Sequence, residues 1–532
     1  MMFLDCTFRD GGYYNAWDFP ESLVTEYLDA MKASGVDVVE MGFRSLKTTG
    51  FKGASAYTTD DYLRGISFPA GLTVGVMINA SELVGDVSWE TAIEELFPVP
   101  ADETPVELVR IASHVHEFEP ALPAVLWLKE RGYQVGFNLM QVADRTEKEV
   151  KHLARKAADY PLDVLYFADS FGGMTPDQAA QIIQWMRTEW DGPMGIHTHD
   201  NMGLALSNSL RAIEEGVTWI DSTVTGMGRG PGNARTEEVA IEVAALRDQN
   251  INMVPLMTLL RKHFRPMQEQ YGWGTNPYYF LAGKYGIHPT YIQTMLGDSR
   301  YDEEDVLSVI NHLRNEGGKK YDATTLASAR HFYGDTPRGT WAPSERLEGR
   351  EVLLLGAGPG VADHQDAIER FIRRRSPLVI ALNTQTGISS SLIDIRVASH
   401  PVRLLADGAK HAELPQPLIA PYSMLPDDVK ESLSGQEVLD FGLRVVPETL
   451  EFAETFCTIP SSLVVGYALA VATSGKAARV FLAGFDGYGA DDLRDQEMQS
   501  LFEAYSAQEA AIGLTAITPT RYGIHTESVY AL

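Results

Sequence analysis

The 532-residue chain contains very few cysteines and no long apolar segment. Its two cysteines, Cys6 and Cys457, are too few for a disulfide scaffold or a cysteine-based zinc cage. The longest apolar stretch, residues 463–473, would reach across only about half of a membrane. The N-terminal residues lack the basic and apolar pattern of a signal peptide. We therefore expect a cytoplasmic protein that does not bind membranes.

Basic residues are also scarce. The chain has 44 Lys and Arg against 72 Asp and Glu, which gives a formal net charge of −28. So acidic a surface repels nucleic-acid backbones and anionic lipids, and we expect neither as a partner. The remaining composition, 45% hydrophobic and 22% charged, is that of a globular protein with a large core.

Short apolar runs alternate with amphipathic helical segments up to about residue 226. Eight runs have strand character: 3–8, 36–43, 72–78, 108–112, 134–139, 164–168, 194–196 and 219–224. Alternating strands and helices predict a parallel sheet, and eight units in about 250 residues are typical of a (β/α)8 barrel. An open, doubly wound sheet is the alternative.

The chain beyond the barrel divides into three further parts. We expect the TIM barrel over residues 1–245 and a helical extension over 246–335. A stretch with Pro337, Gly339, Pro343 and Gly349 predicts a linker over 336–350. After it a new strand–turn–helix pattern predicts a Rossmann-like α/β domain over 351–532.

The strongest chemical pattern is the run 195–203, GIHTHDNMG. Side chains two apart in a strand point to the same face, so His197 and His199 project together. They stand at the C-terminal end of the seventh strand, where barrel active sites lie. Two adjacent imidazoles suit a divalent metal. The alternative is a hydrogen-bonded pair in a polar barrel mouth.

A carboxylate ligand could come from the end of the first strand. There Arg9 and Asp10 precede Gly11 and Gly12. Strict strand alternation would place Arg9 and Asp10 on opposite faces, so both reach one site only if the pleat breaks after Phe8. The two glycines make such a break inexpensive. A surface Arg–Asp pair that caps a turn is the alternative.

Taken together, these motifs resemble the DRE-TIM metallolyase family, which includes 3-hydroxy-3-methylglutaryl-CoA lyase, isopropylmalate synthase and 4-hydroxy-2-oxovalerate aldolase. The matching segments follow the family order: 9–11 (RDG), 197–200 (HTHD), 201–208 (NMGLALSN) and 226–237 (GMGRGPGNARTE), with lesser matches at 39–43, 109–112 and 169–176. The resemblance covers roughly residues 1–240.

The resemblance implies a metal site and a reaction. Asp10, His197 and His199 would be metal ligands, with Asn233 either a fourth ligand or a residue just behind them. The metal would be Mn2+ or Mg2+, with Zn2+ or Co2+ as alternatives. Arg9 would stabilise an enolate.

The implied enzyme is a metal-dependent carbon–carbon lyase. It would join or cleave a 2-oxo acid such as pyruvate and an aldehyde through a metal-bound enolate. The alternatives are a Claisen-type acyl-CoA condensing enzyme or lyase, and a barrel of reduced activity that serves the C-terminal domain. The family resemblance further implies a homodimer or a higher homo-oligomer.

Other residues are assigned by the same resemblance. The aldolases place a catalytic histidine three residues after the metal-binding aspartate, where this chain has Tyr13. Tyr13 is therefore a candidate proton-transfer group, together with Tyr278 of the extension, for which helix packing is the alternative role. The substrate-binding candidates, all at or near strand ends, are Glu40, Arg110, Asn138, Asp169 and Ser170.

The C-terminal domain carries a partial phosphate-binding pattern. Gly356, Gly358 and Gly360 follow a strand, but the dinucleotide pattern requires a third glycine where Val361 stands. The next strand ends at Asn383 rather than at an acidic residue. The domain faintly resembles Rossmann-like glycosyltransferase domains, so a nucleotide or nucleotide-sugar is the ligand that we expect at these four residues. A tight turn without a ligand is the alternative.

Overall fold

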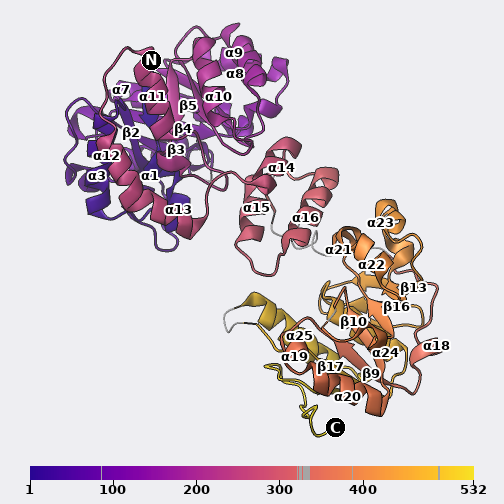
Figure 1. Ribbon diagram of the computed structural model, residues 1–532. Coiled ribbons are helices and arrows are strands. Elements are labelled where there is room, and N and C mark those ends of the chain that lie inside the picture. The colour runs from indigo at the N-terminus through magenta and orange to yellow at the C-terminus, as the bar shows by residue number, and fades with distance from the viewer. Residues whose placement is uncertain are drawn as a thin grey trace. The chain divides into compact units, whose positions relative to one another are not determined.

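The computed structural model describes residues 1–85, 87–319, 321–322, 326, 333, 336–385, 387–488 and 492–532. The chain divides into two compact units (Figure 1). The barrel unit comprises Met1–Gln293 and Gly317–Tyr321, and the second unit comprises Thr294–Glu316 and Asp322–Leu532. This division falls inside the predicted extension 246–335, whose residues 320, 323–325, 327–332 and 334–335 lie outside the described part of the chain. The four-part division into domains stays a prediction.

The barrel unit contains a closed barrel of eight strands that follow one another in chain order. They are β1 (Met2–Asp5), β2 (Val38–Phe43), β3 (Thr73–Asn79), β4 (Leu108–Ser113), β5 (Gln134–Leu139), β6 (Val164–Asp169), β7 (Met194–Thr198) and β8 (Trp219–Ser222). The barrel closes where β1 pairs in parallel with β8, with Met2 opposite Trp219 and Asp5 opposite Ser222. The predicted (β/α)8 barrel is confirmed, and an open sheet is excluded.

Helices follow the strands on the outside of the barrel (Figure 1). They are α3 (Glu21–Ala33), α4 (Asp60–Arg64), α5 (Trp89–Leu96), α6 (Val115–Ala121), α7 (Pro123–Glu130), α8 (Glu147–Ala158), α9 (Pro176–Arg187), α10 (Ala205–Glu214) and α11 (Thr236–Leu246). Local sequence fixes where they begin: at α8 the hydroxyl of Thr146 accepts from the Glu149 amide, and the Glu149 carboxylate accepts from the Thr146 amide. The buried face of this helix is apolar.

The barrel is followed by further helices. They are α12 (Val254–Leu259), α13 (Arg265–Tyr271), α14 (Pro277–Tyr285) and α15 (Pro289–Leu296). Proline occupies the first turn of α12 and of α14, where its missing amide costs no hydrogen bond. Among the residues that the structure describes, no helix is both long enough and apolar enough to cross a membrane.

The first strand is shorter than predicted. The apolar run 3–8 predicted a strand through Phe8, but β1 ends at Asp5 and a short helix, α1 (Thr7–Asp10), follows. The Asp5 carboxylate accepts a hydrogen bond from the Thr7 amide at 2.8 Å, which turns the chain out of the sheet. A second short helix, α2 (Gly12–Asn15), continues from there.

The second unit is built on a seven-stranded sheet in which every recorded pairing is parallel. Its order is β13 (Val438–Asp440), β12 (Leu418–Ala420), β11 (Ile395–Val397), β10 (Leu378–Leu382), β9 (Glu351–Leu355), β17 (Arg479–Ala483) and β18 (Leu514–Ala516). The order reverses beside β9, which has β10 on one side and β17 on the other. Such a switch point is where open parallel sheets bind ligands. The predicted C-terminal α/β architecture is confirmed.

Smaller elements complete the second unit. A three-stranded sheet orders β14 (Gly442–Val445), β16 (Phe456–Ile459) and β15 (Glu451–Phe452). The helices are α16 (Glu303–Glu316), α18 (Ser344–Leu347), α19 (Gly360–Asp363), α20 (Gln365–Arg375), α21 (Pro401–Ala406), α22 (Gly408–Glu413), α23 (Asp427–Ser432), α24 (Val464–Ser474) and α25 (Leu493–Ser506). The longest apolar run of the sequence is α24, a buried core helix.

Candidate active site

The interior of the barrel is layered by the alternation of its strands. A lower layer is apolar and is made by Leu4, Val38, Leu108, Val164 and Trp219. Two residues further along the strands stand Glu40, Arg110, Tyr166 and Asp221, so they face the same interior one layer higher. On β7 the corresponding pair is Gly195 and His197; a Cβ at Gly195 would lie 2.4 Å from the Tyr166 ring. The strand period thus places a polar layer on an apolar floor.

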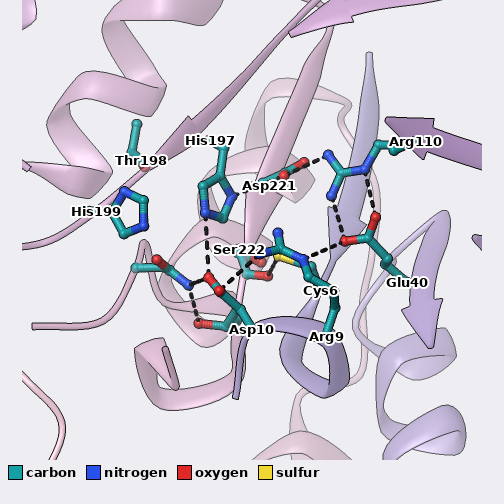
Figure 2. Close-up of polar contacts among 12 residues, drawn as sticks. Cys6, Arg9, Asp10, Glu40, Arg110, His197, Thr198, His199, Asp221 and Ser222 are labelled. Carbon is teal, nitrogen blue, oxygen red and sulfur yellow. Dashed lines mark hydrogen bonds and ion pairs between the residues drawn. The ribbon is translucent and has the colours of Figure 1, made fainter. Parts of the chain in front are cut away.

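Six side chains of this layer and of α1 form a closed ring of polar contacts (Figure 2). The successive distances are Arg9–Asp10 2.9 Å, Asp10–His197 3.4 Å, His197–Asp221 3.0 Å, Asp221–Arg110 2.7 Å, Arg110–Glu40 2.7 Å and Glu40–Arg9 2.9 Å. All six side chains are at least nine-tenths buried. Three carboxylates face two guanidinium groups, so the ring has one surplus negative charge when His197 is neutral.

The short helix α1 brings Arg9 and Asp10 to the same site. Both residues are buried, and they point toward His197 and Glu40 (Figure 2). The predicted break in the pleat exists, but it comes after Asp5 and it does not use glycine flexibility, because Gly11 has an ordinary helical φ of −71°. Gly11 is instead required for its size: a Cβ there would lie 2.6 Å from the Met227 sulfur.

Asp10, His197 and His199 form a candidate metal centre, since their ligand atoms all lie within 4.8 Å of one another. The two imidazole rings stand 5.0 Å apart between centroids, as their spacing in the strand predicts. Nδ1 of His197 contacts Asp221 at 3.0 Å, and Nδ1 of His199 contacts the Asp169 carbonyl at 2.6 Å. These contacts orient each ring through Nδ1, and Nε2 of His197 lies 3.4 Å from the Asp10 carboxylate, its fellow candidate ligand.

Asn233 completes the donor set. Its amide nitrogen donates to Asp10, and its Oδ1 is buried with no hydrogen-bond partner among the described residues. Backbone hydrogen bonds join the segment around Asn233 to the end of β7. The Asp200 amide donates to the Gly232 carbonyl, and the Ala234 amide donates to the Thr198 carbonyl. A carboxylate, two imidazoles and an orphaned amide oxygen fit a divalent cation with nitrogen and oxygen ligands.

Electrostatics shift the pKa values of these three candidate ligands in different directions. Burial raises the pKa of Asp10, but the charge of Arg9 and the contact with His197 outweigh it and hold that pKa well below its ordinary value. Burial, with His197 as the next cause, lowers the pKa of His199 to about 3, so the ring is neutral. Burial also lowers the pKa of His197, but its contacts with Asp10 and Asp221 leave it above its ordinary value.

Comparison with known proteins places the barrel unit in a family. Residues 1–261 match the HMGL-like family model. A 4-hydroxy-2-oxovalerate aldolase of Carboxydothermus hydrogenoformans is 27% identical over 324 residues, which are 60% of this chain and 93% of that protein. The aldolase of the same name from Pelotomaculum thermopropionicum is 31% identical over 255 residues, 46% of this chain and 69% of that protein. The chain belongs to the HMGL-like family.

This membership confirms the resemblance to the DRE-TIM metallolyases and, at the level of the family, the prediction of a lyase or aldolase. The relatives include one of a different name: oxaloacetate decarboxylase of Mycobacterium tuberculosis is 26% identical over 237 residues, 44% of this chain and 67% of that protein.

The five predicted substrate-binding residues of this HMGL-like barrel form two pairs and one single residue. Glu40 and Arg110 are 1% and 0% exposed and contact each other in the buried ring. Asn138 and Asp169 end β5 and β6, and each has a buried side-chain oxygen without a partner in the described structure. Burial raises the pKa of Asp169 to about 7. Ser170 accepts a hydrogen bond from the Gln141 amide at 2.9 Å, which ties two loops together.

The two tyrosines predicted to transfer protons, Tyr13 and Tyr278, lie in different surroundings. Tyr13 is 38% exposed, with its ring 4.8 Å from that of Trp17. Tyr278 is half-buried on α14, whereas its neighbour Tyr279 is 2% exposed and packs on the glycine-rich segment before Asn233: a Cβ at Gly230 would lie 2.9 Å from the Tyr279 ring.

Two residues of the site were missed from the sequence. Asp221 orients His197 and pairs with Arg110, yet it stands in the apolar run 219–224. An acidic residue inside an otherwise apolar strand was the available indication. Tyr14 accepts a hydrogen bond from the Gly230 amide at 2.9 Å, and burial raises its pKa to about 12. Nothing in its sequence context distinguishes Tyr14 from Tyr13.

Proposed function

We propose that the barrel unit is a divalent-metal-dependent aldolase. It joins a pyruvate-like 2-oxo acid to an aldehyde, or cleaves the product. The cluster of Asp10, His197 and His199 with the orphaned oxygen of Asn233 carries this proposal. The names of two relatives, both 4-hydroxy-2-oxovalerate aldolases, support it. In the forward direction the methyl carbon of the 2-oxo acid loses a proton and bonds to the aldehyde carbon, whose oxygen gains a proton.

The chain supplies four cation ligands: the Asp10 carboxylate, Nε2 of His197 and of His199, and Oδ1 of Asn233. A bound cation acts as a Lewis acid on the carbonyl and carboxylate oxygens of a 2-oxo acid. Mixed nitrogen and oxygen ligands with room for water suit Mn2+ or Mg2+. Zn2+ and Co2+ are the alternatives that metal analysis distinguishes.

Arg9 is the residue that we assign to the enolate. It is 7% exposed and fixed by Asp10 and Glu40, so its guanidinium cannot swing away when negative charge develops nearby. A donor held in place before the reaction stabilises an oxyanion better than one that must reorient. Glu40 and Arg110 act in our assignment by holding Arg9 and, through Asp221, His197, rather than by touching the substrate.

The remaining predicted residues keep proposed roles around this centre. Asn138 and Asp169 end neighbouring strands with unpaired oxygens, which suits them to hydrogen-bond a substrate. Ser170 supports the Gln141 loop. Tyr13 and Tyr278 stay predictions as proton-transfer groups.

For the second unit we propose a nucleotide or nucleotide-sugar ligand at Gly356, Gly358, Gly360 and Asn383, beside the switch point of the sheet. The Gly360 amide donates to the Asp486 carboxylate at 3.1 Å, so a ligand phosphate would have to displace Asp486. A thermal-shift panel of NAD, CMP, UDP and GDP ligands tests this assignment, and a panel without any shift removes it.

Isotope exchange tests the barrel reaction without knowledge of the aldehyde. Purified protein with Mn2+ should exchange the methyl protons of pyruvate with deuterium from solvent, and chelation should stop the exchange. Exchange into acetyl-CoA but not pyruvate would replace the aldolase with a Claisen-type enzyme. Absence of exchange in both would leave a barrel of reduced activity.

We further propose that the protein acts in the cytoplasm on small molecules and forms a homodimer or a higher homo-oligomer. Light scattering coupled to size-exclusion chromatography measures the oligomeric state.

A further inference from the structure

Arg229 is an arginine beside the proposed metal site whose guanidinium faces no acidic partner in the described part of the chain. Its recorded side-chain contact is with the Tyr13 ring, 4.4 Å from the centroid. By contrast, Arg9, Arg110 and Arg235 each pair with carboxylates within 2.9 Å. Arg229 therefore differs from these neighbours in having no recorded carboxylate partner.

The neighbours of Arg229 fix its position relative to the site. A Cβ at Gly228 would lie 2.6 Å from the Asn233 amide nitrogen, which itself donates to Asp10. On the other side, the Gly230 amide donates to Tyr14. The backbone of Arg229 is therefore held between a candidate metal ligand and the half-buried Tyr14, while Tyr13 supports the guanidinium. Stacking on an aromatic face leaves the edge of a guanidinium free for an anion.

The electrostatic surroundings agree with this placement. The charge of Arg229 is a contributing cause, after burial, of the lowered pKa of His199 and of His288. His288 has a second basic neighbour in His114.

We infer that Arg229 binds an acidic group on the aldehyde, so that the preferred acceptor is an aldehyde bearing a carboxylate or a phosphate. This inference rests on the proposed aldolase function. In the proposed function a bound cation would hold the carboxylate of the 2-oxo acid and Arg9 would stabilise the enolate, which leaves Arg229 for the second substrate. A fixed guanidinium binds carboxylates and phosphates through paired hydrogen bonds.

Matched aldehydes test the inference. Succinic semialdehyde against pentanal probes a carboxylate, and glyceraldehyde 3-phosphate against glyceraldehyde probes a phosphate. We expect wild-type kcat/KM to favour at least one anionic member roughly 10- to 100-fold over its neutral partner, the range of a hydrogen bond to a charged group. Which arm shows the preference identifies the acidic group.

Variants assign the preference to Arg229. Arg229→Gln should bring the anionic-to-neutral ratio close to one, and Arg229→Lys should keep part of it. The control Arg211→Gln removes the same charge from α10, where Arg211 pairs with Glu215, and should keep the full ratio. A merely structural Arg229 would lower both members of each pair equally, and that result would overturn the inference.

Pyruvate exchange separates the two possible failures. If wild-type protein exchanges pyruvate protons but uses neutral aldehydes as well as anionic ones, the inference about Arg229 is wrong and the proposed function stands. If wild-type protein neither exchanges pyruvate protons nor consumes any aldehyde, the proposed function is wrong and the inference falls with it.

Discussion

The two units place similar glycine-rich segments after parallel strands but use them in opposite ways. In the barrel unit, residues 226–232 follow β8 and lead to Asn233, whose oxygen is buried and unpaired in the described structure. In the second unit, residues 356–360 follow β9, and Asp486 occupies the Gly360 amide. The barrel segment therefore leads to an oxygen that can still accept a bond, whereas the Gly360 amide in the segment of the second unit already donates one. Unpaired polar atoms distinguish a candidate site better than glycine spacing does.

The buried arginines show the same contrast. Arg110 lies between Glu40 and Asp221, and it is fully buried. Arg396 of the second unit is 1% exposed, but its recorded partners are neutral oxygens of Gln416, Asn383 and Gln385. A charged ring holds the proposed catalytic residues of the barrel, whereas Arg396 joins a loop to the sheet.

The largest expected effect separates the metal ligands from the acidic residue of the second unit. His199→Ala should remove the stoichiometric cation and lower pyruvate exchange by at least about a thousandfold, because Lewis-acid catalysis contributes several kcal/mol. Asp486→Ala should leave both unchanged. Elemental analysis and deuterium exchange measure the two variants. Full exchange by His199→Ala would contradict the metal assignment, and lost exchange in Asp486→Ala would contradict the independence of the two sites.

Breaking the charged ring should cost stability. Arg110→Met takes the arginine partner away from Asp221 and leaves Glu40 paired with Arg9 alone, and removal of one partner of a buried ion pair costs about 3–5 kcal/mol. The matched variant Arg211→Met breaks the Glu215 pair on the exposed face of α10 and should cost under about 1 kcal/mol. Urea unfolding, followed separately in each unit by hydrogen exchange and mass spectrometry, gives both values. Equal losses of unfolding free energy in the two variants would mean that the charged ring does not stabilise the barrel.

These contrasts also mark how far the sequence could lead. The alternation of apolar runs located all eight barrel strands, and β5 begins and ends where its run does. Periodicity works here because parallel strands covered by helices are apolar throughout. It failed at β1, where a hydrogen bond from the Thr7 amide to the Asp5 carboxylate ends the strand inside an apolar run. Hydrophobic patterns carry no information about such a bond.

The site could be predicted in part for a similar reason. His197 and His199 share a face because of their spacing, which a strand converts directly into geometry. The ring of Glu40, Arg110 and Asp221 joins strands that are distant in the sequence, so their pairing depends on barrel closure and register. Arg229 could not be singled out, because the absence of an acidic partner is a property of the folded chain.

Replacement of one glycine by alanine in each glycine-rich segment tests the difference between the two units. A Cβ at Gly228 would lie 2.6 Å from the Asn233 nitrogen, and a Cβ at Gly358 would lie 2.1 Å from an Asp486 oxygen. Gly228→Ala should weaken cation affinity roughly 10- to 100-fold, as disturbance of groups around a metal site does. Gly358→Ala should leave cation affinity unchanged and destabilise the second unit by about 1–3 kcal/mol through the loss of the Asp486 bond. Calorimetric Mn2+ titration and urea unfolding measure the pair, and interchanged effects would refute the contrast.

The smallest expected effect concerns acid stability, to which each unit contributes one histidine: His288, which is half-buried, and His411, which is buried. Burial, followed by the charges of Arg229 and His114, lowers the pKa of His288 to about 4, and burial lowers that of His411 despite nearby Asp407. In the unfolded chain each of these histidines has a pKa near 6.5, whereas in the folded chain its pKa is lower, so the unfolded chain binds the proton first as the pH falls. The resulting stabilisation is present above pH 6.5 and is lost as the pH falls toward 4.

His288→Gln should therefore reduce the loss of barrel stability between pH 7 and pH 5 by about 1–2 kcal/mol, and His411→Gln should act on the second unit alone. The control His116→Gln removes an exposed ring, hydrated in both its states, and should keep the wild-type difference. Hydrogen exchange at the two pH values resolves the units. If His288→Gln stabilised the second unit instead, the two units would not unfold separately, and their independence would have to be abandoned. If neither variant changed the pH dependence, the proton uptake on unfolding would lie with other groups.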